Sequence, residues 1–188
     1  MGTMQPLARR IGRDHDLARS LWESGWHEAR LLAVLVEDPS RVTQRQMNAW
    51  AGDFDSWALC DTTCIRLFRR TPFAWDKARS WPCSPREFVR RAGFALMASL
   101  AVHEKAAPNA RFLALLPIAE AAAGDGRNIA KKGVVWALRA IGGRNSALNA
   151  ATLAVARRLT TSDDSTRRWV GQQTIRLLLR STRTPRTR

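Results

Sequence analysis

The sequence has little of what builds disulfide-stabilised, membrane-spanning or β-sheet proteins. Its 188 residues include three Cys and no Tyr, and no apolar stretch approaches the roughly 18 residues of a transmembrane helix. The small, odd number of thiols argues against a disulfide framework and favours a reducing compartment. The first residues also lack the apolar core of a secretion signal. These absences predict a cytoplasmic protein without a membrane span.

Acidic residues are also scarce, and unevenly so. The chain carries 31 Lys and Arg against 16 Asp and Glu, a formal charge of +15, and only four of the cations are Lys. Residues 1–60 hold 7 basic and 8 acidic residues, whereas residues 61–188 hold 24 and 8. Such an excess predicts a polyanionic partner, most commonly nucleic acid. Arg suits forked phosphate contacts, although genome base composition gives the same skew.

Period-two alternation is missing, and helical periodicity runs through nearly the whole chain. Residues typical of helix starts stand at Thr43, at Thr71 before Pro72, and at Ser84. We expect helices over 14–24, 27–37, 43–52, 56–70, 73–81, 86–103, 109–123, 127–141, 146–159 and 164–180. Short connections predict an all-α fold, either a bundle or stacked antiparallel helix pairs. We expect one domain over residues 1–180 and a disordered basic tail over 181–188.

Basic pairs recur along the second half of the chain, at residues 90–91, 131–132 and 167–168. The intervals of 41 and 36 residues fit two-helix HEAT-like repeats. The first two pairs share a pattern of two apolar, two basic and one or two small residues. In a stack of repeats, equivalent positions form a column, so these pairs would form a basic stripe. The alternative is a solvated face with coincidental charge.

Trp57 and Asp61 are separated by one helical turn and therefore share a helix face, if Asp55 or Ser56 caps that helix. Asp61 is the only acid between Ser56 and Trp75. Two interpretations are open. Asp61 forms a salt bridge with a nearby Arg, or its carboxylate faces a cation that a nucleic-acid substrate presents.

A second cluster combines cations with an aromatic ring. Lys132, Trp136 and Arg139 lie at i, i+4 and i+7 of one predicted helix, where a core helix would carry aliphatic residues. This combination suits contact with phosphate and with a sugar or base, and Arg91 is the matching basic position one repeat earlier. Alternatively, Trp136 belongs to the core and the cations extend around it.

Other chemistry finds no support in the sequence. Cys60 and Cys64 lack further ligands for a zinc site, and the three His lack a nucleophile pattern. Gly124-Asp125-Gly126 is interpreted as a turn rather than a phosphate-binding loop. We therefore expect no metal and no cofactor. Five further tryptophans are expected to pack in the core: Trp22, Trp26, Trp50, Trp75 and Trp81.

Four segments in order resemble the DNA alkylation repair family of HEAT-like-repeat proteins, the alkylpurine DNA glycosylases. They are Leu21–Arg30, Phe54–Asp61, Phe88–Ala92 and Lys131–Arg139, within a similarity over residues 7–178. The resemblance implies a HEAT-like α-solenoid whose concave basic face holds duplex DNA containing alkylated bases. It implies a monofunctional glycosylase that removes 3-methyladenine and 7-methylguanine without metal. It also implies helices preceding Met1, so that this chain is a shortened member.

The resemblance further implies roles for single residues. Asp61 looks like the catalytic carboxylate, and Trp57 and Trp136 look like the aromatic pair beside the sugar of the lesion. Arg91 looks like the arginine that contacts the DNA backbone at the lesion. Together with the basic residues noted above, the expected DNA-binding residues are Arg90, Arg91, Lys131, Lys132 and Arg139. Because the lesion is already cationic, it leaves without a strong general acid, and a carboxylate stabilises charge on the sugar. The alternatives are a non-catalytic nucleic-acid-binding module and a protein–protein scaffold.

Overall fold

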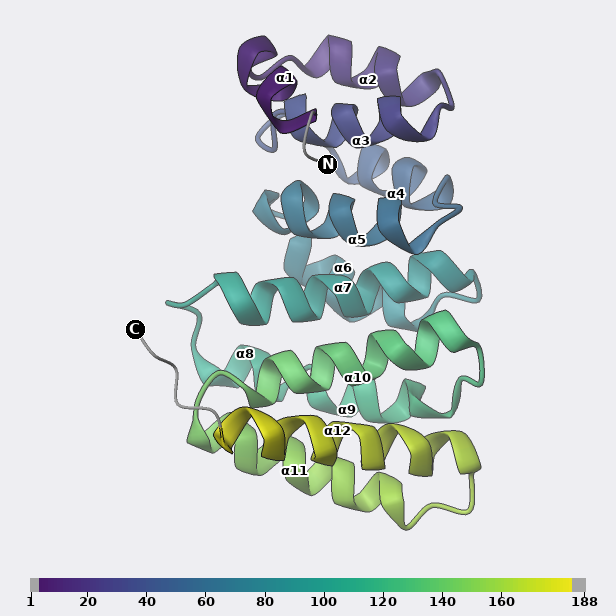
Figure 1. Ribbon diagram of the computed structural model, residues 1–188, viewed down its shortest axis with the longest axis vertical. Helices are drawn as coiled ribbons and strands as arrows, with labels where there is room; N and C mark the ends of the chain where they lie inside the picture. Colours follow the sequence, from purple (N-terminus) through teal and green to yellow (C-terminus); the bar gives the residue numbers. More distant parts are fainter. Residues whose placement is uncertain (1–3, 184–188) are drawn as a thin grey trace.

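The structure is a computed structural model that describes residues 4–183, with side chains to residue 180 (Figure 1). This part of the chain forms α-helices and short 3-10 helices, and no strand. The α-helices are α1 Met4–Ile11, α2 His15–Glu23, α3 His27–Val36, α4 Gln44–Gly52, α5 Trp57–Arg66, α6 Ala74–Ser80, α7 Glu87–His103, α8 Asn109–Leu113, α9 Leu116–Ala121, α10 Asn128–Gly142, α11 Ser146–Thr160 and α12 Ser165–Arg183. The 3-10 helices are η1 Phe68–Arg70, η2 Trp81–Cys83 and η3 Ala122–Gly124.

The helices stack in pairs along one axis (Figure 1). One row, here called the front row, comprises α3, α5, α7, α10 and α12, and each member packs on the next. The back row comprises α2, α4, α6, α8 with α9, and α11. Helix α1 packs on α3 and extends the front row by one short helix. The predicted all-α fold of stacked helix pairs is confirmed.

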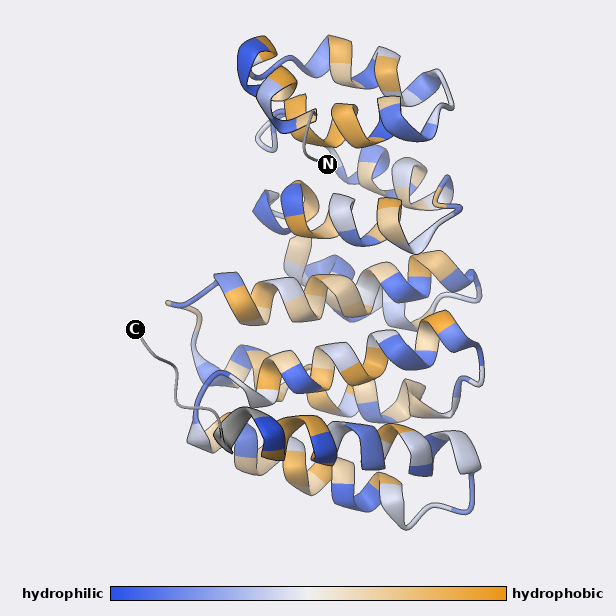
Figure 2. Cartoon of the chain, viewed as in Figure 1, coloured by the Kyte–Doolittle hydropathy of each residue, from blue (hydrophilic) through white to orange (hydrophobic). Residues whose placement is uncertain are grey.

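A single apolar core runs through the stack from Ala8 to Val170, and the helices carry mixed apolar and hydrophilic stripes along its whole length (Figure 2). Two glycines allow helices to cross closely. A Cβ on Gly133 would lie 3.3 Å from the Phe94 side chain, and one on Gly93 only 2.4 Å from the Pro82 ring. The small residues that follow the basic pairs in the sequence therefore serve helix packing.

Several local expectations were wrong. Helix α1 was not predicted, because an eight-residue helix gives little periodic signal and depends on packing. The expected helix over 109–123 is divided, since Pro117 in the first turn of α9 has no N–H to continue the ladder. Ser84 does not cap α7; its hydroxyl accepts from the Arg86 N–H in the preceding turn. Thr71 does not cap α6, and its hydroxyl donates to the carbonyl of Phe68.

The chain end and the tryptophans also differ from expectation. Helix α12 continues to Arg183, beyond the predicted limit of the domain, and residues 184–188 lie outside the described residues. Trp22 and Trp50 are buried and stacked with ring centroids 4.0 Å apart. Trp26, expected in the core, is 75% exposed because it stands just before α3 begins.

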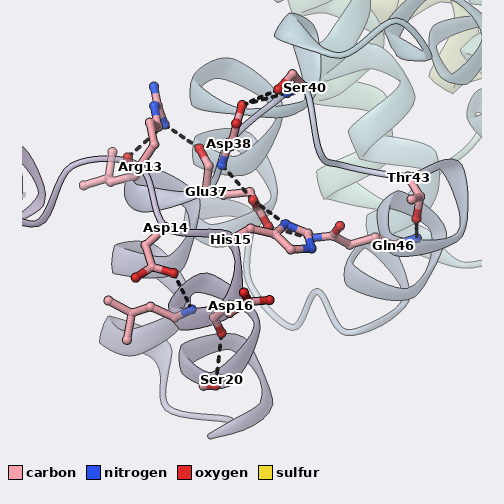
Figure 3. Close-up of polar contacts among 12 residues, drawn as sticks. Arg13, Asp14, His15, Asp16, Ser20, Glu37, Asp38, Ser40, Thr43 and Gln46 are labelled. Atoms are coloured by element: carbon pink, nitrogen blue, oxygen red, sulfur yellow. Dashed lines mark hydrogen bonds and ion pairs between the residues drawn. The ribbon is translucent and has the colours of Figure 1, made fainter.

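The buried carboxylate of Glu37 connects helices α2, α3 and α4 (Figure 3). The Glu37 side chain is fully buried and accepts hydrogen bonds from the Gln46 amide at 2.6 Å and the Asp38 N–H at 2.7 Å. His15 Nδ1 lies 2.8 Å from the same carboxylate. Because a buried carboxylate is costly without partners, these contacts fix the starts of α2 and α4 against the end of α3.

We expect Gly93→Ala to lower the free energy of unfolding by about 1–3 kcal/mol. The added methyl would meet the rigid Pro82 ring, which cannot move aside, although alanine itself favours helix. Urea unfolding of the purified variant measures the change. Gly126→Ala is the control, since its nearest neighbour atom would be 3.9 Å away and the change should stay within about 0.5 kcal/mol. Equal stability of both variants would contradict the close crossing.

Candidate nucleic-acid interface and active site

The first turn of α5 places an aromatic ring and a carboxylate on one face. The Ser56 hydroxyl caps the helix by accepting from the Leu59 N–H, so that Trp57 is its first residue. Trp57 is 61% exposed. Asp61 follows one turn later, as the sequence predicted from their spacing. An exposed indole therefore stands beside a carboxylate on the front row.

Asp61 is paired with Arg91 of α7. The Arg91 Nε and Nη2 atoms donate to the two carboxylate oxygens at 2.8 and 2.7 Å, in the forked geometry typical of guanidinium. The side chains are 15% and 11% exposed. Arg91 Nη1 also donates to the Ile129 carbonyl of α10 at 2.9 Å. The salt-bridge interpretation of Asp61 thus describes the structure, and its partner is the very arginine expected to contact DNA.

Opposing effects act on the charge of Asp61. Burial raises its pKa above the ordinary carboxyl value, and the hydrogen bonds and positive charge of Arg91 oppose part of the rise. The net shift is upward. The ion pair with Arg91 therefore does not fully offset the loss of hydration that burial imposes on the Asp61 carboxylate.

Three of the predicted site residues occupy equivalent positions in neighbouring front-row helices. Asp61, Arg91 and Lys132 are each the fifth residue of α5, α7 and α10. Trp136 lies one turn after Lys132, and the Arg91 guanidinium carbon is 6.0 Å from the centroid of its ring. Asp61 and Trp136 thus lie beside Arg91, and Trp57 lies one helical turn before Asp61 on α5.

The basic pairs separate, because adjacent residues of a helix point in different directions. While Arg91 faces Asp61, Arg90 donates to Asp125 at 2.7 Å and to the Ser84 carbonyl at 2.8 Å. Lys131 turns toward α12, with its ammonium 5.0 Å from the Trp169 ring centroid. The prediction that Arg90 and Lys131 contact DNA stays untested, but both have partners within the protein.

Lys132 and Arg139 are exposed on α10, on either side of the half-buried Trp136. Neither cation forms a side-chain hydrogen bond or ion pair with any residue between 4 and 180. Their donors remain available for a ligand, as a phosphate-binding role requires. Of the five predicted DNA-binding residues, these two have the least competition from the protein itself.

Sequence reasoning missed the role of Asp125, which was interpreted only as part of a turn. Its carboxylate accepts from Arg127 Nη2 at 2.6 Å, from the Arg127 N–H at 3.0 Å and from Arg90. Hydrogen bonds from Arg127, followed by that from Arg90, lower the pKa of Asp125 to about 2. The Asp-x-Arg spacing was the available signal, because a carboxylate two residues before an Arg can bind its backbone and its side chain.

Other kinds of site find no support in the described residues. They contain no group of three or more His, Cys, Asp or Glu placed to hold a metal ion. Cys60 and Cys64 are buried thiols that face α7, and their sulfurs lie 3.5 Å from the carbonyls of Phe88 and Ala92. Within residues 4–183, none of the helices combines the length and apolarity needed to cross a membrane.

Comparison with known proteins shows the family and the fold of the chain. The sequence profile of a family described as DNA alkylation repair enzyme matches residues 1–175. The chain belongs to this family. A solved structure described as "a new family of proteins related to the HEAT-like repeat DNA glycosylases with affinity for branched DNA structures" superposes with a TM-score of 0.75 at 18% identity. The match covers 93% of this chain and 80% of that one, and it shows the HEAT-like fold. A search of curated proteins finds no match.

We expect Asp125→Asn to destabilise the protein at pH 7 by about 1–2 kcal/mol. The Asp125 carboxylate has a lowered pKa, so its contribution is complete above the unfolded value near 3.8 and is lost as the pH falls toward about 2. The gap between wild type and variant should therefore close between pH 5 and pH 2 in urea titrations.

Asp163→Asn is the matched control for this prediction. Asp163 is exposed, and its carboxylate has no hydrogen bond or ion pair among the described residues. Its stability change should stay within about 0.5 kcal/mol at every pH. A gap for Asp125→Asn that does not change with pH would contradict the assigned ion pairs.

Proposed function

We propose that this member of the DNA alkylation repair family is a DNA glycosylase that hydrolyses the N-glycosidic bond of cationic alkylated purines in duplex DNA. The observation that supports this most is the convergence of Trp57, Asp61, Arg91 and Trp136 from three adjacent front-row helices. Substrates of this kind, 3-methyladenine and 7-methylguanine, carry positive charge. A carboxylate one helical turn from Trp57, and bonded to the arginine beside Trp136, suits them.

The chemistry requires little acid–base work from the protein. The bond from C1′ of the deoxyribose to the base nitrogen breaks, and its electron pair neutralises the departing purine cation. Positive charge then develops on C1′ and the ring oxygen, where Asp61 stabilises it. Water adds at C1′ and loses a proton to complete the hydrolysis. The indole faces of Trp57 and Trp136 add cation–π attraction.

Arg91 acts on Asp61 and on the DNA in this proposal. Its two parallel hydrogen bonds hold the carboxylate in one orientation, which lowers the cost of organising the site. The same guanidinium can also donate to a phosphate at the lesion, where Lys132 and Arg139 supply additional positive charge.

A second candidate function is binding of branched DNA without base removal. It is favoured by the closed Asp61–Arg91 ion pair, which offsets much of the carboxylate charge, and by the description of the structural neighbour as having affinity for branched DNA. In this case the front row binds the backbone, and Asp61 serves mainly to hold Arg91.

We expect Asp61→Asn to lower the rate of base release by about a hundredfold or more. The amide keeps the shape of the side chain but cannot stabilise charge on the sugar. The measurement is release of 7-methylguanine and 3-methyladenine from methylated duplex DNA under single-turnover conditions, with DNA affinity determined in parallel and expected to persist. Wild-type release should fall as acid protonates Asp61, at a higher pH than for an ordinary aspartate because burial raises its pKa.

Asp76→Asn is the control, since Asp76 lies on α6 in the back row and pairs only with Arg79. It should retain the wild-type rate. Equal rates for wild type and Asp61→Asn would remove Asp61 from the reaction. A wild type that releases no base yet prefers a four-way junction to linear duplex would establish the second candidate instead.

We expect Trp57→Ala to slow base release by about two- to thirtyfold, the range of a cation–π contact. Trp57 is 61% exposed, so its removal should leave the fold intact. Trp26→Ala is the matched control, because Trp26 is also exposed and stands one repeat earlier, outside the proposed site. Melting temperatures confirm folding of both variants. Equal loss of rate in the two would show that exposed indoles act generally and not at this position.

A further inference from the structure

A cavity of about 370 Å³ lies between α1 and α5, over the end of α3. Three of its seven lining residues are arginines: Arg9 on α1, Arg13 in the turn that follows, and Arg66 at the end of α5. Its other lining residues are neutral: Gln5, Ala8, Gly12 and Leu35. Three arginines thus line one space, and none of its seven lining residues is acidic.

The turn that carries Arg13 is held firmly in place (Figure 3). Gly12 adopts a left-handed conformation with φ of +80°, which turns the chain at the end of α1. Arg13 Nη1 then donates to the carbonyls of Leu35, at 3.1 Å, and Glu37. Since the Glu37 side chain is fixed by buried hydrogen bonds, the loop and its arginine have a defined position.

The remaining donors of the cavity have no protein partner. Arg9 and Arg66 are exposed, and neither forms a side-chain hydrogen bond or ion pair with the residues that the structure describes. The carboxylate of Glu37 belongs to the neighbouring network and does not line the cavity. Three like charges repel one another, so an anion in this space gains from all three at once. Forked guanidinium groups suit phosphate oxygens in particular.

The location links the cavity to the proposed site. Helix α5 carries both Asp61 and Arg66, which are separated by roughly 7 Å of helix rise. Helices α1, α3 and α5 are consecutive along the front row. A strand whose lesion lies at Asp61 would bring further phosphates along the same row.

We infer that the cavity formed by Arg9, Arg13 and Arg66 binds a backbone phosphate of DNA that flanks the nucleotide at Asp61. This inference rests on the proposed function only in taking the front row as the DNA-binding side. Ligand sites for nucleosides are mostly apolar and aromatic, whereas this wall has no aromatic ring. The contact is therefore independent of base identity and adds affinity without selecting sequence.

The test is the double variant Arg9→Gln/Arg66→Gln, measured for equilibrium binding to unmodified linear duplex over a range of salt concentrations. We expect affinity to fall about tenfold and the slope of log K against log salt to become shallower by about one unit, since one phosphate contact contributes about 0.9. Single-turnover base release at saturating DNA should be unchanged, because the residues act on binding and lie outside the reacting group.

Arg19→Gln/Arg45→Gln is the control with the same loss of charge. These two arginines line a cavity on the back-row helices α2 and α4, where Glu23 supplies negative charge. Equal loss of affinity in the two double variants would overturn the inference, as would an unchanged salt slope in Arg9→Gln/Arg66→Gln. A melting temperature raised by millimolar inorganic phosphate in the wild type but not in the variant, with equal DNA affinity, would assign the cavity to a free anion and also overturn it.

The outcomes separate this inference from the proposed function. If Asp61→Asn retains activity, or the wild type releases no base, the glycosylase proposal fails while the binding data on Arg9 and Arg66 remain decisive for the cavity. If the salt slope is unchanged while Asp61→Asn loses its rate, the cavity assignment fails and the glycosylase proposal stands.

Discussion

Hydrogen bonds from arginine side chains to backbone carbonyls of the preceding repeat hold the stack in register. Arg86 donates to the carbonyl of Gly52, Arg127 to that of Pro85 at 2.8 Å, and Arg167 to that of Ala121 at 3.3 Å. Each stands where a front-row helix begins, at intervals of 41 and 40 residues. In a solenoid each repeat touches only its neighbours, so such a bond sets how one pair sits on the next. A guanidinium has the donors to satisfy a turn carbonyl and still reach a carboxylate.

The same hydrogen bonds explain why the net charge overstates the number of cations that are available to bind a ligand. Arg144 donates to carbonyls at the end of α7, at 2.6 Å for Ala101, and Arg90 and Arg127 share Asp125. These cations belong to the internal structure. The arginine-rich composition therefore serves architecture as well as the proposed DNA binding, and a cation without an internal partner among the described residues, such as Lys132, is a better indicator of an interface than the total of +15.

The sequence allowed local relations to be predicted but not the partners that tertiary packing supplies. Ser56 as a cap placed Trp57 and Asp61 on one face, and that required only helix geometry. Asp61 and Arg91 are thirty residues apart, and their pairing depends on how α5 crosses α7. The repeat spacing predicted a basic stripe, yet which residue of each pair faces outward is decided by neighbours such as Asp125. The arginine cavity needs α1 to pack on α3, a contact for which no sequence signal was found.

Asp61 and Asp125 show how the same side chain obtains opposite properties within one basic stack. Asp125 receives hydrogen bonds from two arginines and a backbone N–H, and its pKa falls to about 2. Asp61 receives only the fork of Arg91, and burial raises its pKa. The Asp125 carboxylate, with its several donors, is stable and chemically inert, because its charge is already satisfied. Environments that push the pKa values of two like groups apart assign them different roles. In the proposed reaction Asp61, and not Asp125, is therefore the carboxylate that faces the cationic lesion.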